Sequence, residues 1–317
     1  MNLSKTERNK VTAFAPATVA NVACGFDVMG FALDEPGDIV TVHKRDSAGV
    51  IITNISGDSG RIPKAVDKNT AGFAVLEYLK TTNINCGVAI EIHKQAPIGS
   101  GLGSSAASPA AAVLAVNTLF GNPLSRKELL PFAIKGESIA ANAVHADNVA
   151  PSLLGGFILI RGYDPVDIVQ LKVPNELYCS VILPQVEIHT AEARKLLSKT
   201  IFLEDAITQW GNVGGLVAGL EKSDYGLISR SLQDVVAEPV RSHLIPGFSE
   251  MKKAAINAGA LGCSISGSGP AVFALCKGKT IANAVGKAMQ AVLNKLRVGN
   301  SLYVSGVNRQ GARIIEG

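Results

Sequence analysis

The stretch of sequence that decides the fold is Pro97-Ile98-Gly99-Ser100-Gly101-Leu102-Gly103-Ser104-Ser105-Ala106-Ala107. It follows the alternating segment 88–93, which is typical of a half-buried strand, and it opens an alanine-rich run to Phe120 that is typical of a helix. Glycines let the backbone approach a ligand closely, and the start of a helix offers unpaired N–H groups to a phosphate. Strand, loop and helix together predict a phosphate-binding site, and residues 97–103 are called the glycine loop below.

The spacing of the glycines separates this loop from two familiar phosphate motifs. Positions 99, 101 and 103 do not fit the GxGxxG spacing of a dinucleotide fold, and the loop lacks the Gly-Lys-Ser/Thr ending of a P-loop. A tight turn capped by Ser104 or Ser105 is the structural alternative. Three glycines and two serines at one strand–helix junction favour the phosphate site over that alternative.

Two further segments, one toward each end of the chain, agree with this prediction. The first is Ala15-Pro16-Ala17-Thr18-Val19-Ala20-Asn21-Val22-Ala23-Cys24-Gly25-Phe26-Asp27, and the second is Gly262-Cys263-Ser264-Ile265-Ser266-Gly267-Ser268-Gly269-Pro270-Ala271-Val272-Phe273-Ala274-Leu275. With the segment 97–106, which has the form PxxxGLGSSA, they resemble the three motifs of the GHMP kinases (galactokinase, homoserine kinase, mevalonate kinase and phosphomevalonate kinase). Taken alone, the last segment also fits a structural turn before a buried strand.

The resemblance covers nearly the whole chain and implies a two-domain α+β fold. Residues 1–168 would form a mixed-sheet domain with a left-handed βαβ unit, and residues 169–317 a ferredoxin-like domain, with ATP bound between them. The boundary rests on a change of composition at 163–173, where glycine, proline and aspartate gather. Without the resemblance, the order of strand-like and helix-like segments indicates only α+β.

The resemblance also implies a Mg²⁺ site at Ser105 and Glu137. Magnesium prefers hard oxygen ligands and keeps several waters, so one carboxylate and one hydroxyl beside a nucleotide suit it. Taken alone, without the resemblance, Glu137 is better interpreted as a solvated carboxylate on a helix. Pro109 follows the loop closely and predicts a kinked or weakened start of that helix.

The first motif has the form typical of the family members that phosphorylate L-homoserine, and an amino acid substrate needs particular partners. Its carboxylate is best bound by arginine, which can form a bidentate pair with it, and its ammonium is best bound by a carboxylate. The positions that match the family for these tasks are Asn21, Asp27, His145, Thr190, Arg194 and Arg241. Each alone would more often be a surface or capping residue, and the set is what favours a binding site.

Proton transfer is the step for which the sequence offers no clear residue. Several relatives carry an aspartate as catalytic base at the position of Asn148, and an amide cannot abstract a proton. Asn148 and Asn21 are therefore expected to align the substrate hydroxyl, and the expected reaction, phosphorylation of L-homoserine by ATP in threonine biosynthesis, proceeds without an evident protein base. Whether the neighbouring Asp147 takes part stays open.

Composition argues against several other classes of protein. A net charge of +4 with scattered lysines and arginines gives no basic stripe for nucleic acid, and no apolar run is long enough for a membrane helix. The polar first ten residues do not resemble a signal peptide, and five scattered cysteines suit reduced thiols in the cytoplasm. A homodimer stays open. Two alternatives also remain: another GHMP kinase acting on a mevalonate or diphosphocytidyl-methylerythritol substrate, and a GHMP-like regulator that binds nucleotide or sugar without catalysis.

Overall fold

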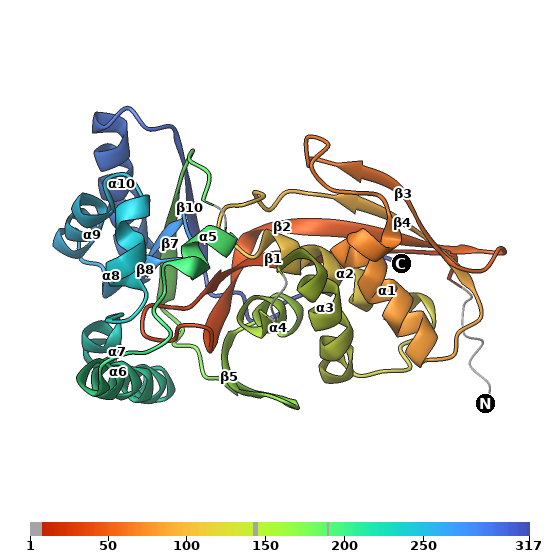
Figure 1. Ribbon diagram of the computed structural model, residues 1–317, viewed down its shortest axis with the longest axis horizontal. Coiled ribbons are helices and arrows are strands. Elements are labelled where there is room, and N and C mark those ends of the chain that lie inside the picture. The colour runs from red at the N-terminus through yellow and green to blue at the C-terminus, as the bar shows by residue number, and fades with distance from the viewer. Residues whose placement is uncertain (1–7, 142–144, 189) are drawn as a thin grey trace.

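The structure is a computed structural model that describes residues 8–141, 145–188 and 190–317. Two domains lie side by side, each built on its own β-sheet (Figure 1). The first sheet contains β1 (Lys10–Ala20), β2 (Met29–Arg45), β3 (Val50–Ser56), β4 (Gly87–His93), β5 (Phe157–Tyr163), β6 (Val166–Leu171) and β11 (Arg313–Glu316). Its main path runs β11-β1-β2-β4-β3, and β5 pairs with both β2 and β6.

Among the described strand pairs, only β3 and β4 run parallel. The chain passes between them through η1 (Val66–Lys68) and α1 (Thr70–Thr81), which gives the βαβ unit that the family resemblance implies; its left-handed sense stays a prediction. Asn69 caps α1, because its side chain accepts hydrogen bonds from the N–H groups of Ala71 and Gly72.

Four helices pack together on the first sheet: α1, α2 (Ser104–Leu119), α3 (Arg126–Ala141) and α4 (Ala146–Leu154). The alanine-rich α2 lies in the middle of this layer and is buried along almost its whole length. Pro109 lies inside it and removes one helical hydrogen bond, yet the helix continues to Leu119. The expected weakening is offset by close packing, since a Cβ on Gly136 of α3 would come within 3.0 Å of the Pro109 Cβ.

The second sheet is antiparallel and has the order β10-β7-β9-β8. Numbered along the chain, this is the 4-1-3-2 order of a ferredoxin-like domain, as expected. Its strands are β7 (Leu177–Pro184), β8 (Gly262–Ile265), β9 (Val272–Lys277) and β10 (Asn300–Gly306). Its helices are α5 (Thr190–Lys195), α6 (Leu203–Lys222), α7 (Tyr225–Ser231), α8 (Glu238–Arg241), η2 (Ser242–Leu244), α9 (Phe248–Asn257) and α10 (Lys279–Lys295).

The sheets change between the end of β6 at Leu171 and the start of β7 at Leu177. A boundary after residue 168 therefore falls inside β6, which still pairs with β5 in the first sheet. The last strand, β11, also returns to the first sheet and pairs with β1. Two crossings of the chain thus connect the domains, and Figure 1 places the C-terminus beside the first domain.

Two further features of the chain bear on its class. Within the three described ranges, no helix combines the length and the apolar character needed to cross a bilayer. All five cysteines lie in those ranges and are unpaired, and four of them are buried.

Candidate active site

A cavity of about 420 Å³ lies where the two domains meet. The first domain contributes the glycine loop, Ser105, Glu137 and the start of α4, and the second contributes Arg194, Arg241 and Gly267. The cavity therefore gathers residues from all three sequence motifs and from both domains.

Hydrogen bonds to the backbone carbonyls of the glycine loop hold it against the other two motifs. The N–H of Thr18 donates to the carbonyl of Leu102 at 3.0 Å, and the hydroxyl of Ser266 donates to the carbonyl of Gly101 at 2.7 Å. Gly101 has φ 79°, and a Cβ there would lie 2.4 Å from the Ser266 carbonyl oxygen, so only glycine fits. Contacts far apart in sequence thus fix the shape of the loop.

The N-terminus of α2 opens into the cavity without a side-chain cap. Gly103, at φ 62°, is the N-cap residue, and the first turn carries no acidic side chain. The Ser104 hydroxyl turns away and donates to the carbonyl of Ala96 at 2.8 Å. Uncapped N–H groups and the positive end of the helix dipole favour an anion at this point.

Ser105 and Glu137 form a buried polar pair beside that N-terminus. The Ser105 hydroxyl donates to Glu137 Oε1 at 2.7 Å, while the buried Oε2 has no hydrogen-bond partner. Burial raises the pKa of Glu137 to about 7, against the opposing effects of the Ser105 hydrogen bond and the Lys94 charge. An unpartnered buried carboxylate oxygen next to a hydroxyl is a donor set that fits a hard cation.

No cluster of three or more His, Cys, Asp or Glu side chains suited to a metal occurs among the residues that the structure describes. Glu137 and Ser105 could therefore hold a cation only together with oxygens from a ligand or from water. That arrangement is typical of Mg²⁺ bound to nucleotide phosphates.

Asp27 and Arg194 face each other in the cavity and form a bidentate ion pair. Arg194 Nη2 lies 2.6 Å from Asp27 Oδ2, and Nη1 lies 3.3 Å from Oδ1. Asn21 fixes the backbone of this segment, because its Oδ1 accepts from the Asp27 N–H at 2.9 Å and its Nδ2 donates to the Gly267 carbonyl at 2.7 Å. The side chain of Asn21 thus connects the first motif to the third.

Arg241 lies deeper than Arg194 and is only 4% exposed. Its Nε donates to the carbonyl of Ala193 at 3.2 Å, and its guanidinium lies 5.1 Å from the centre of the Phe26 ring. Burial lowers the pKa of Arg241, although an arginine remains charged. Two guanidinium groups and one carboxylate therefore gather on one side of the cavity.

The start of α4 brings three polar side chains to the cavity. Asn148 Oδ1 accepts a hydrogen bond from the Thr18 hydroxyl at 2.8 Å, which holds its amide beside Gly103. Asp147 is 2% exposed, its Oδ1 has no partner, and burial together with the Asp27 charge raises its pKa to about 7. Burial also lowers the pKa of His145, so this side chain is neutral near pH 7.

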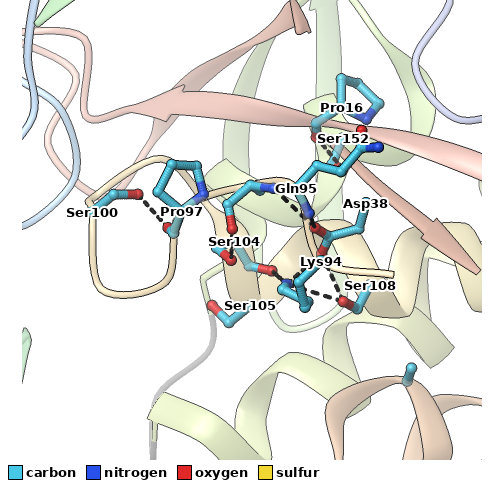
Figure 2. Close-up of polar contacts among 12 residues, drawn as sticks. Pro16, Asp38, Lys94, Gln95, Pro97, Ser100, Ser104, Ser105, Ser108 and Ser152 are labelled. Atoms are coloured by element: carbon cyan, nitrogen blue, oxygen red, sulfur yellow. Dashed lines mark hydrogen bonds and ion pairs between the residues drawn. The ribbon is translucent and has the colours of Figure 1, made fainter. Parts of the chain in front are cut away.

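A buried charge network closes the base of the glycine loop (Figure 2). The Lys94 ammonium donates to Asp38 Oδ2, to the carbonyl of Ser104 and to Ser108 Oγ, while Asp38 Oδ1 accepts from the N–H groups of Gln95 and Ala96 at 3.2 Å each. The side chains of Lys94 and Asp38 are 2% and 0% exposed. The network therefore joins β2, the chain just before the loop and the first turns of α2.

Comparison with known proteins agrees with this geometry. Residues 69–156 match the model of the GHMP kinases N terminal domain, and residues 216–295 match that of the GHMP kinases C terminal domain. A homoserine kinase of Chloroherpeton thalassium is 50% identical, with 96% of this chain and 99% of the relative covered.

The chain belongs to the GHMP kinases.

Solved structures of the GHMP kinases show the same arrangement of domains. The crystal structure of homoserine kinase from Cytophaga hutchinsonii is 54% identical, covers 99% of this chain and 100% of its own, and superposes with a TM-score of 0.97. L. major mevalonate kinase in complex with R-mevalonate has a TM-score of 0.72 at 16% identity, with 96% and 99% of the two chains covered, so it supports the fold alone. The prediction of a GHMP kinase fold is confirmed.

Most residues that the sequence predicts for a GHMP kinase site lie around one cavity. They are Asn21, Asp27, Ile98, Gly99, Ser100, Gly101, Gly103, Ser104, Ser105, Glu137, His145, Asn148, Arg194 and Arg241. Thr190 begins α5, directly after His189, which lies outside the described residues. Their roles in binding and catalysis stay predictions.

The sequence does not predict the roles of three buried charged residues near the cavity: Asp38, Lys94 and Asp147. Asp38 and Lys94 were not singled out, because they are 56 residues apart and only the β2–β4 pairing brings them together. Asp147 was noted only as a neighbour of Asn148, and its burial depends on α4 packing so tightly that a Cβ on Gly30 would lie 1.8 Å from the Asp147 carbonyl oxygen. A lysine or an aspartate inside an apolar, strand-like segment is the one signal that the sequence offers, because such a charge is rarely buried without a partner.

Asp38→Asn is expected to lower the free energy of unfolding by about 3–5 kcal/mol, because it leaves the Lys94 charge buried without an opposite charge. Adding Lys94→Met to Asp38→Asn should recover a large part of that loss in urea unfolding. Lys135→Met, which breaks the exposed pair with Glu77, is the matched control and should cost about 0–1 kcal/mol. A double variant no more stable than Asp38→Asn would contradict the network.

Proposed function

We propose that this chain transfers the γ-phosphate of ATP to the side-chain hydroxyl of L-homoserine and forms O-phospho-L-homoserine, a step of threonine biosynthesis that takes place in the cytoplasm. The observation that carries the proposal is the group of Asp27, Arg194 and Arg241 in the same cavity as the glycine loop. An α-amino acid presents one ammonium and one carboxylate, and this group offers the opposite charge to each. The relatives that are about half identical to the chain are homoserine kinases.

The glycine loop and the N-terminus of α2 are assigned to the phosphates. The uncapped N–H groups of this helix can donate to the phosphate oxygens, and Ile62 and Pro63 with Lys68 offer an apolar wall and a cation for the nucleoside end of ATP. The carboxylate of Asp27 and the guanidinium of Arg194 are assigned to the amino acid, and so the other end of the cavity is left for the nucleotide. Phosphates and amino acid would then meet between Ser105 and Asn148.

Ser105 and Glu137 are assigned to Mg²⁺. Bound there, the ion would neutralise charge on the nucleotide phosphates. Glu137 would bind it as the carboxylate, and the hydroxyl of Ser105 would then be released from its hydrogen bond to Oε1. The raised pKa of Glu137 means that cation binding displaces a proton from part of the population near neutral pH.

Alignment of the substrate hydroxyl by the enzyme, without a protein base, is assigned as the protein's contribution to proton transfer. The Asn148 amide, fixed by Thr18, can hydrogen-bond the substrate hydroxyl, and Asn21 holds the segment that carries Asp27. Asp147 is the one buried acid nearby that could compete for this role, and its pKa of about 7 leaves much of it protonated before substrates arrive. Anionic phosphates would favour the protonated form further, and we assign Asp147 no role as a base. A loose transition state needs little activation of the nucleophile, so the hydroxyl proton leaves late, to the transferring phosphoryl group or to water.

Asp147→Asn is therefore expected to keep kcat within about tenfold of the wild type, because an amide mimics a protonated carboxyl, whereas a general base contributes about 10²–10⁴-fold. Asn148→Ala should also cause only a modest loss. The measurement is kcat at saturating substrates from pH 5.5 to 9. If Asp147→Asn loses activity in the larger range and the acidic limb of the profile disappears, Asp147 is the base and the base-free assignment is wrong.

The function itself is tested by assaying purified protein with ATP and Mg²⁺, with L-homoserine or mevalonate as acceptor. Formation of O-phospho-L-homoserine with L-homoserine, and no turnover of mevalonate, is the expected result. Turnover of mevalonate alone would assign a different GHMP kinase activity. Nucleotide binding without any turnover would indicate a regulator.

A further inference from the structure

The turn that follows β3 presents an arginine at the cavity. Arg61 lines the cavity together with Gly99 of the glycine loop. The Nη2 atom of Arg61 lies 4.0 Å from the place that a Cβ on Gly99 would occupy. A guanidinium group therefore lies beside the loop that is assigned to the phosphates of ATP.

The backbone of this turn is held firmly, although the Arg61 side chain is exposed. Gly57, at φ 77°, packs so closely that a Cβ there would lie 2.1 Å from the Lys94 carbonyl oxygen. Asp58 is 6% exposed, its Oδ2 accepts from the Ile62 N–H at 3.0 Å, and its carbonyl accepts from the Arg61 N–H at 3.1 Å. The arginine can therefore change its partner by moving its side chain alone.

The partner of Arg61 in the structure belongs to the other domain. Arg61 Nη2 donates to Glu187 Oε1 at 2.8 Å. Glu187 lies between β7 and α5, and Figure 1 shows α5 on the side of the second domain that faces the first. The pair thus joins the domains at the nucleotide end of the cavity, as the Asp27–Arg194 pair joins them at the amino acid end.

The Arg61–Glu187 pair is easily broken. The two side chains are 50% and 57% exposed, and ion pairs exposed to this extent contribute little and are screened by salt. A phosphate is a stronger ligand for a guanidinium, because arginine can bind it with two parallel charge-assisted hydrogen bonds. A nucleotide on the glycine loop would therefore compete well with Glu187 for the same Nη2 atom.

The other cationic side chains that line the cavity are Lys68, Lys94, Arg194 and Arg241. Asp38 already neutralises Lys94, and Asp27 neutralises Arg194. Arg241 lies on the amino acid side of the cavity and is buried. A single Mg²⁺ neutralises only part of the charge of a triphosphate, so a further cation beside the loop is needed. Arg61 has the right position and only a weak partner to give up.

We propose that Arg61 binds the phosphates of ATP and that Glu187 holds its guanidinium until the nucleotide arrives, an inference that rests on the proposed function. Gly99 lies at the start of the loop, six residues before Ser105. The contact therefore falls on the α- or β-phosphate, whereas the γ-phosphate is transferred beside Ser105. Arg61 is thus a residue for nucleotide affinity, and Glu187 competes with ATP for it.

Two substitutions that break the same ion pair should consequently have opposite effects. Arg61→Gln removes the phosphate ligand and should raise the KM for ATP and the Kd for ADP by about tenfold or more, with kcat nearly unchanged. Glu187→Gln removes the competitor and should lower both constants by about twofold to fivefold. The double variant should behave like Arg61→Gln, because Glu187 then has no arginine to hold.

Initial rates with L-homoserine give KM and kcat, and calorimetric titration with ADP and Mg²⁺ gives Kd without turnover. Adenosine, which has no phosphate, is the second probe, and Arg61→Gln should bind it as the wild type does. Arg61→Lys keeps the charge and should recover part of the ADP affinity. Lys64→Gln is the matched control, since the exposed Lys64 ammonium donates to the Thr53 carbonyl at 2.9 Å outside the cavity.

An Arg61→Gln variant that binds ADP as the wild type does would overturn the proposal. Equal losses of ADP affinity in Arg61→Gln and Glu187→Gln would overturn it as well, because the pair would then be a clamp between the domains. Equal losses of adenosine and ADP in Arg61→Gln would place the arginine against the nucleoside instead. A wild type that binds ADP without phosphorylating L-homoserine refutes the proposed function alone, and one that binds no nucleotide refutes both.

Discussion

Replacing Glu137 by glutamine should lower kcat by about a hundredfold or more while the melting temperature changes little. The substitution keeps the size of the side chain and an oxygen that can accept from the Ser105 hydroxyl, but it removes the only carboxylate assigned to the cation. A bound cation supplies several kcal/mol of charge stabilisation in phosphoryl transfer, which corresponds to this loss in rate. Because the pKa of about 7 leaves part of Glu137 protonated near neutral pH, the neutral amide should be well tolerated in the fold.

The measurement is kcat across a series of Mg²⁺ concentrations, with a melting curve for each variant. Glu250→Gln is the matched control, since Glu250 is exposed on α9 and does not line the cavity. A Glu137→Gln variant with near wild-type kcat at ordinary Mg²⁺ would remove Glu137 from the metal site. A large fall in melting temperature would instead mean that the carboxylate has a structural role.

The parts of the fold that the sequence predicts well are those set by local chemistry. The Asn69 cap of α1, the glycine loop and the alanine-rich helix after it depend on residues within a few positions of each other. By contrast, β2 runs for 17 residues from Met29 and continues through the Pro36-Gly37 pair, which is typical of a turn. Pairing with β1 and β4 decides this strand, and such long-range pairing leaves no local signal.

Helix α4 is also hard to predict from the sequence, for a related reason. Its nine residues include Pro151 and are followed by the cap residue Gly155, which is at φ 77°, so propensity alone argues for a loop. The helix forms because its apolar side chains Val149 and Leu153 are fully buried against β1 and β2. The positions of Asp147 and Asn148 in the cavity follow from that packing, and so the family motif indicated which residues matter without indicating how they are held.

The Asp27–Arg194 pair yields the second large effect. In the structure these two groups neutralise each other, so an amino acid must exchange partners with them: its ammonium takes the place of Arg194 at Asp27, and its carboxylate takes the place of Asp27 at Arg194. Losing one charge-assisted hydrogen bond costs about 1.5–3 kcal/mol, or about tenfold to a hundredfold in affinity. Arg194→Ala and Asp27→Asn should each raise the KM for L-homoserine by about that factor and leave the KM for ATP nearly unchanged.

Two truncated substrates make this prediction specific to each group. 4-Hydroxybutyrate lacks the ammonium, so Asp27→Asn should bind it as well as the wild type does, whereas Arg194→Ala should still bind it poorly. 3-Aminopropan-1-ol lacks the carboxylate, so Arg194→Ala should bind it as well as the wild type does, whereas Asp27→Asn should bind it poorly. Binding is measured as KM or as competitive inhibition against L-homoserine. Arg161→Ala, which breaks the exposed pair with Asp167 outside the cavity, is the control and should change none of these constants. Equal losses for ATP and for both truncated substrates would show that the variants disturb the cavity as a whole and that the charges do not divide the substrate in this way.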